Sequence, residues 1–186
     1  MPPITPEESI LIQALALAES YVNLGELEVG NDPLISDNID RVFGPTGKKL
    51  TQLGHSVFQG QGTLVSVFYM FLVLPHEWAK HTGSDFKNLD LSKAEAFARA
   101  KAKVEPICDG QEKYEENYGA LRHFRNALSH GRIYGCEDGL IIEDKKGKKF
   151  YRAVYSYEVL GELAQHLYEA IRTHLHMAMS QRPPKA

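Results

Sequence analysis

The sequence predicts an all-α fold, a helical bundle of about five helices with one small β-hairpin inserted near residues 139–154. Helix-capping signals followed by apolar residues at helical spacing recur along the chain, and a β-prone pattern replaces them only once. A length of 186 residues with 43% hydrophobic residues suffices for one well-buried core, not for two. We therefore expect a single domain over residues 1–180 and a polar tail at 181–186.

The N-terminal segment carries a strong helix start. Thr5 and Glu8 have the spacing of a capping box, and Pro6 suits the first helical position between them. One apolar face follows at Leu11, Ala14, Leu15, Ala18 and Val22. The stretch from Leu24 to Gly62 is rich in Gly, Asn and Asp, which predicts a long connection with one short helix around residues 50–57.

An apolar run at residues 64–74 precedes Pro75. It is much shorter than the roughly 20 residues that a membrane-spanning helix needs. We expect a buried central helix that the proline closes, with a buried strand as the alternative because the run contains β-branched and aromatic residues. Residues 82–90 then predict a loop.

Two further helices are predicted before the hairpin. Ser92 and Glu95 indicate a helix start, and Pro106 stops that helix. Asp109 and Glu112 repeat the pattern and open the next helix. The core stripe of this helix is predicted at Tyr114, Tyr118, Leu121 and Leu128.

The hairpin prediction rests on two β-prone runs, residues 139–144 and 149–154, which flank a basic turn containing Gly147. Ser156 then caps a final helix. The apolar face of this helix carries Leu160, Leu163, Ala164, Leu167, Ile171, Leu175 and Ala178.

Composition limits the partners and the compartment. The formal charge of -3 does not attract nucleic acid to the whole protein, so any polyanion must bind a local basic patch. Cys108 and Cys136 lack metal-ligand spacing, which favours free thiols in a reducing, cytoplasmic compartment. The acidic, proline-bearing start does not resemble a signal peptide. We expect no membrane association, no metal and no cofactor.

One segment of the helix predicted after Asp109 combines residues suited to phosphodiester chemistry. Arg125 and Asn126 are followed at a short distance by His130, and Gly131 comes directly after. These side chains supply a fixed cation, an orienting amide and a group that exchanges protons near neutral pH. Cleavage of RNA without a metal can use all three.

Helical geometry restricts how these residues act together. At about 100° per residue, Arg125 falls about 20° from Tyr114, in the middle of the predicted core stripe. Its guanidinium must therefore meet a carboxylate or open onto a cleft or interface that binds an anion. His130 would point about 140° away from Arg125 and lie about 7.5 Å further along the helix axis. Either Gly131 ends the helix and frees His130 to turn, or a two-fold partner brings one chain's arginine near the other's histidine.

The sequence from Arg125 to His130 resembles the signature of the HEPN superfamily, an Arg, four to six intervening residues and a His, very often with a polar residue directly after the Arg. The resemblance implies an α-helical bundle, usually a homodimer whose two motifs face each other across a cleft. In many members it also implies metal-independent endoribonuclease activity. Small free-standing members of this kind are commonly toxins, paired with an antitoxin, or phage-defence nucleases.

The resemblance suggests a mechanism in which Arg125, Asn126 and His130 are the catalytic residues. His130 exchanges a proton with the ribose 2′-OH or the 5′ leaving oxygen, and Arg125 stabilises the charge of the pentacoordinate phosphate. Asn126 positions the phosphate or the imidazole. The products would be a 2′,3′-cyclic phosphate and a 5′-hydroxyl, and DNA would not be cut because it lacks the nucleophile.

Two other interpretations stay open. Arg125 can form a buried ion pair with Glu115 or Glu116 of a partner chain while His130 caps a helix, which makes a purely structural dimer. A non-catalytic module that binds RNA or a protein would have a similar sequence. Weaker candidates for RNA binding, each also typical of solvated surface, are Arg122, His123, Arg132, Lys145, Lys146, Lys148 and Lys149.

Overall fold

The computed structural model describes residues 6–26, 61–82, 89–115 and 117–180. Several sequence predictions lie outside these residues. They are the cap at Thr5, most of the connection from Leu24 to Gly62 with its short helix, the centre of the predicted loop before Asp90, Glu116, and the tail at 181–186.

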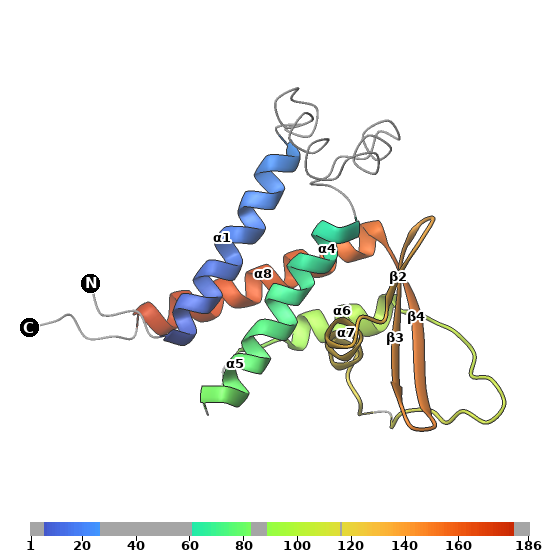
Figure 1. Cartoon of the computed structure of the whole chain (residues 1–186). Helices are drawn as coiled ribbons and strands as arrows, with labels where there is room; N and C mark the ends of the chain where they lie inside the picture. Colours follow the sequence, from blue (N-terminus) through green and yellow to red (C-terminus); the bar gives the residue numbers. More distant parts are fainter. Residues whose placement is uncertain (1–5, 27–60, 83–88, 116, 181–186) are drawn as a thin grey trace, which may run out of the picture.

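Helices make up most of the described chain (Figure 1). They are α1 (Pro6–Glu26), α4 (Gln61–Phe68), the π-helix η2 (Tyr69–Val73), α5 (Leu74–Thr82), α6 (Ser92–Lys101), α7 (Ala120–Ser129) and α8 (Tyr157–Ser180). Because α4, η2 and α5 follow one another without a break, the described residues form five helices. The strands are β1 (Lys103–Val104), β2 (Ile133–Cys136), β3 (Gly139–Lys146) and β4 (Lys149–Ser156).

The four strands form one antiparallel sheet in the order β1-β4-β3-β2. The predicted hairpin is confirmed as β3 and β4, joined at Gly147, whose φ of 61° suits the tight turn between Lys146 and Lys149. The all-α prediction is wrong, because β1 and β2 extend the hairpin and make the fold mixed α/β. Both added strands are too short to give a strand pattern in the sequence.

The central apolar run is helical and largely buried, as predicted, but Pro75 does not end it. In η2 the Leu74 N–H donates to the Tyr69 carbonyl, five residues back, instead of the usual four. This wider turn immediately precedes Pro75, which has no N–H to continue the ordinary ladder. The helix therefore continues through the proline to Thr82 and carries His76 on its last turns.

Helix α6 begins at Ser92 as predicted but ends at Lys101, before Pro106. The chain after Lys101 is extended, because Lys103 pairs with Val154 and Val104 pairs with Ala153 on β4. Helix α7 differs more from its prediction. It begins at Ala120, so the start predicted at Asp109 and Glu112 is wrong, and neither Tyr114 nor Tyr118 belongs to the helix.

The core lies between the helices and one face of the sheet (Figure 1). Helix α8 packs against α1, α4 and α6, and α7 packs against both η2 and β3. The Ser156 hydroxyl accepts from the Val159 N–H, which confirms the cap of α8. The inward face of α8 consists of Leu160, Leu163, Leu167, Ile171 and Leu175. Among the described helices, none combines the length and the apolar character needed to cross a membrane.

Candidate functional site

The start of α7 is fixed by a carboxylate from another helix. The two oxygens of Glu95 on α6 accept the N–H groups of Ala120 and Leu121 at 2.6 and 2.8 Å. A carboxylate satisfies free N–H groups there and also favours the positive end of the helix dipole. Gly119 leaves room for it, because a Cβ at that position would lie 2.9 Å from Glu95 Oε2.

The end of α7 has the geometry of a Schellman motif. Gly131, with φ of 63°, donates to the Leu128 carbonyl, and Arg132 donates to the Ala127 carbonyl. His130 is the C-cap residue, and its φ of -106° and ψ of 7° are not helical. Gly131 therefore ends the helix at His130, as the first of the two arrangements requires, and a turn of His130 toward Arg125 is its separate, second condition.

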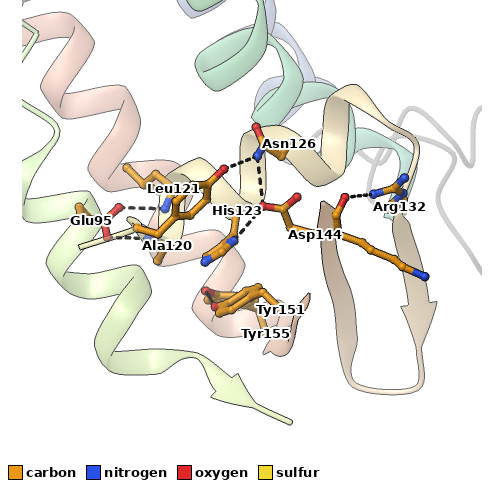
Figure 2. A network of polar contacts seen from close by, with 11 residues as sticks. Glu95, Ala120, Leu121, His123, Asn126, Arg132, Asp144, Tyr151 and Tyr155 are labelled. Atoms are coloured by element: carbon orange, nitrogen blue, oxygen red, sulfur yellow. Dashed lines mark hydrogen bonds and ion pairs between the residues drawn. The ribbon is translucent and has the colours of Figure 1, made fainter. Parts of the chain in front are cut away.

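The side of α7 that faces the sheet carries a buried polar network (Figure 2). Asp144 of β3 is 2% exposed, and its Oδ2 accepts from His123 Nδ1 at 2.9 Å and from Asn126 Nδ2 at 3.1 Å. The same Asn126 nitrogen donates to the Tyr118 hydroxyl at 2.9 Å. This network joins α7, β3 and the segment that precedes α7.

Aromatic rings enclose the network. The His123 ring stacks on Tyr151 with centroids 3.8 Å apart, and it also contacts Tyr114 and Tyr118. Burial pushes the pKa of Asp144 upward, but the hydrogen bonds from His123 and Asn126 outweigh it and hold that pKa below the usual range. Asp144 is therefore an acceptor-only carboxylate, which makes His123 Nδ1 the donor.

The side of α7 that faces α5 carries the Arg125 guanidinium. Arg125 is half-buried, and its Nη1 lies 3.0 Å from His76 Nδ1. Within the described residues no carboxylate of the same chain lies at ion-pair distance from Arg125. Glu115, which the structural interpretation pairs with Arg125 of a partner chain, lies 3.0 Å from Lys149 Nζ of its own chain. The hydrogen-bond partner of this half-buried cation among the described residues is thus the imidazole of His76, not an anion.

The charge state of His76 follows from its surroundings. Partial burial, and then the cations of Arg125 and Lys80, lower the pKa of His76 from its ordinary value. The ring is therefore neutral near pH 7. Burial also lowers the pKa of Arg125, followed by the charge of Arg122, although a guanidinium stays protonated throughout the physiological range.

His130 stands apart from this pair. Its side chain is exposed, and its ring makes no hydrogen bond or ion pair with the part of the chain that the structure describes. Arg125 and His130 therefore lie on one helix but are not joined by a contact in one protomer. Asn126, between them, has its amide nitrogen committed to Tyr118 and Asp144.

The flanking residues differ from one another in exposure. The prediction that His123 lies exposed beside the motif is wrong, because it is 3% exposed and cannot reach a surface ligand. Arg122 is exposed and covers the Tyr118 ring at 4.2 Å. Arg132 donates to the Lys145 carbonyl on the hairpin. The exposed basic side chains at the hairpin tip are Lys145, Lys146 and Lys148, while Lys149 pairs with Glu115.

Sequence reasoning missed three residues of the site: His76, Tyr118 and Asp144. Asp144 left a readable signal, because it follows Leu140 and Ile142 at alternate positions and so belongs to the buried face of β3. Tyr118 was assigned to a helix that does not extend to it. His76 gave no signal, since it follows the proline at which the helix was expected to end.

Comparison with known proteins identifies the family of this chain. A family model described as HEPN pEK499 p136 matches residues 23–176, well over half of the chain. The chain belongs to the HEPN superfamily. The resemblance based on Arg125 to His130 is thereby confirmed, and ribonuclease activity is common in this superfamily. Comparison of this HEPN domain with curated proteins and with solved structures gives no match.

Proposed function

We propose that this HEPN protein is a metal-independent endoribonuclease that cuts RNA by attack of the ribose 2′-OH. The observation that carries the proposal is the Arg125 guanidinium, which is half-buried and has no carboxylate partner among the described residues. A buried cation without an anion is costly, and phosphate, like carboxylate, has oxygens that match the bidentate geometry of a guanidinium. Membership of a superfamily with many nucleases supports the same conclusion.

In this proposal Arg125 binds the non-bridging oxygens and stabilises the extra charge of the pentacoordinate phosphate. His130, exposed at the end of α7, takes a proton from the 2′-OH or gives one to the 5′ oxygen. Asn126 holds Tyr118 and Asp144 in place through its amide nitrogen and keeps its carbonyl oxygen for orientation. The products are a 2′,3′-cyclic phosphate and a 5′-hydroxyl.

A second copy of the chain completes the site in this proposal. Arg125 and His130 share no contact in one protomer, and a two-fold axis near the end of α7 would bring the arginine of one copy to the histidine of the other. One base and one acid would then come from two protomers. The lysines of the hairpin tip and Arg122 would contact the RNA backbone, and a toxin or defence role in the cytoplasm would require an antitoxin or another regulator.

The test is cleavage of a mixed RNA pool in EDTA by the purified protein, with a matched DNA pool as the substrate control. His130→Ala is compared with His176→Ala, which removes an exposed histidine from α8. We expect cyclic phosphate ends from the wild type and from His176→Ala, and none from His130→Ala. A folded wild type that binds RNA but leaves it intact in this assay would contradict the nuclease and favour the non-catalytic binding module.

A further inference from the structure

We propose that His76 is a positioning residue, which holds the Arg125 guanidinium in place for phosphate by accepting one of its N–H groups at Nδ1. The inference rests on the proposed nuclease function. The two nitrogens lie 3.0 Å apart, and an arginine always donates because it has no lone pair to offer. Nδ1 of His76 is therefore unprotonated, and the single proton of the neutral ring is on Nε2.

A neutral partner suits this task better than a carboxylate would. A guanidinium has five N–H donors, and one bond to an imidazole leaves the others free for a phosphate. An Asp or Glu at the same place would neutralise the positive charge that the phosphate must meet. His76 belongs to α5 and Arg125 to α7, and η2, which α5 continues, packs directly on α7, so the bond holds the guanidinium against a neighbouring helix.

The bond depends on pH in a defined direction. Protonated His76 cannot accept at Nδ1, and its charge would repel Arg125. Partial burial and then Arg125 lower the pKa of His76, so the neutral ring persists somewhat below the usual histidine range and is lost as the pH falls further. Helix α1, which also packs against α5, carries the buried Glu8. The charged groups acting on His76 from α5 and α7 are Arg125, Lys80, Glu77 and Arg122.

The first experiment tests the bond in the full chain without reference to activity. Long-range proton–nitrogen NMR of the histidine rings gives the tautomer and the titration of each, and His76→Gln identifies the His76 signals by their loss. We expect an Nε2–H tautomer at pH 7 and an upward shift of the His76 pKa in Arg125→Gln, because a nearby cation is removed. An Nδ1–H tautomer, or a pKa that Arg125→Gln leaves unmoved, would overturn the proposal.

The second experiment tests positioning by kinetics. In His76→Ala we expect kcat to fall by about tenfold to a hundredfold, with KM changed much less, because a loosened guanidinium is misplaced for the transition state. His76→Gln provides an acceptor that does not titrate, so it should recover part of kcat and remove one protonation from the acid limb of the pH profile. His176→Ala is the matched histidine control.

The outcomes separate this inference from the proposed function. A wild-type kcat in His76→Ala, with an unchanged acid limb in His76→Gln, would overturn the positioning role while the nuclease stands. Absence of cleavage by the wild type would overturn the nuclease, and with it the role of His76 toward phosphate, whereas the NMR titration would still establish or refute the His76–Arg125 bond.

Discussion

The two sides of α7 make opposite use of polar residues. Toward the sheet, His123 and Asn126 both donate to Asp144. His123 and Asp144 are buried, and Asn126 is half-buried. Toward α5, the Arg125 guanidinium has one hydrogen-bond partner among the described residues, the ring of His76, and His130 at the end of the helix is exposed. A helix of ten residues thus separates a closed network from an arrangement with unused hydrogen-bonding capacity.

Energetics explain why the two sides differ. A buried polar group without a partner is costly, so the sheet side is stable only when each donor has its acceptor. A half-buried guanidinium without an anion contributes nothing comparable to folding, and such groups persist where a ligand supplies the anion. We infer that the side of α7 facing the sheet stabilises the fold and that the side facing α5 binds an anionic ligand.

The largest contrast is expected from His130→Ala. Loss of a proton-transfer group lowers cleavage by about a hundredfold to ten-thousandfold. Stability should change by no more than about 0.5 kcal/mol, because the side chain is exposed. Initial rates on RNA and urea unfolding of the same preparation measure both effects. A large loss of stability in this variant would mean that His130 has a structural role.

Asp144→Ala should produce the reverse pattern. It leaves the buried His123 and the half-buried Asn126 without their common acceptor, and the free energy of unfolding should fall by about 3–5 kcal/mol. Urea denaturation measures it, with Glu143→Ala, a less buried neighbour on the same strand, as the matched control. If Asp144→Ala unfolds like the wild type, the buried network is not what holds α7 to the sheet.

Acid should weaken the sheet side through the same carboxylate. The pKa of Asp144 is lower in the folded state, despite its burial, because His123 and Asn126 bond to the ionised form. This contribution to stability is therefore complete above the unfolded carboxyl pKa of about 3.9 and is lost as the pH falls through the lower native value. Urea midpoints from pH 5 to pH 3 should drop more steeply for the wild type than for Asp144→Asn.

Glu95→Ala tests the element that both sides share. Removing the carboxylate leaves the N–H groups of Ala120 and Leu121 without their acceptor, and the expected loss is about 1–2 kcal/mol of unfolding free energy. Glu162→Ala, at an exposed position of α8, is the control in the same unfolding assay. A loss no greater than in the control would mean that α7 begins at Ala120 for another reason.

The sequence predicted those elements whose signals are local. Ser156 is followed directly by the helix that it caps, Gly147 lies within the turn that it permits, and Arg125 and His130 lie within one short motif. The start of α7 could not be predicted this way, because Glu95, which fixes it, is 25 residues from Ala120. A capping pattern near Asp109 was therefore indistinguishable from a real helix start.

The rest of the site depends on contacts across the fold. His76 is 49 residues from Arg125, and its helix reaches it only because η2 accommodates Pro75. Asp144 is 18 residues from Asn126 and meets it only after β3 packs on α7. The strands β1 and β2 were missed for a similar reason, since two-residue and four-residue strands exist through pairing rather than through pattern.

The smallest effect is expected from Arg122, which lies between the two sides. Its guanidinium covers the Tyr118 ring on the network side, and its charge also lowers the pKa of His76. An exposed cation–π contact contributes about 0.5–1 kcal/mol, so Arg122→Ala should lower stability by no more than that. The His76 pKa, followed by NMR, should rise, but by less than in Arg125→Gln, because Arg125 acts on His76 more strongly. If Arg122→Ala destabilised the protein as much as Asp144→Ala, the sheet side and the α5 side of α7 would form one cooperative unit. The two sides of α7 would then not have separate roles.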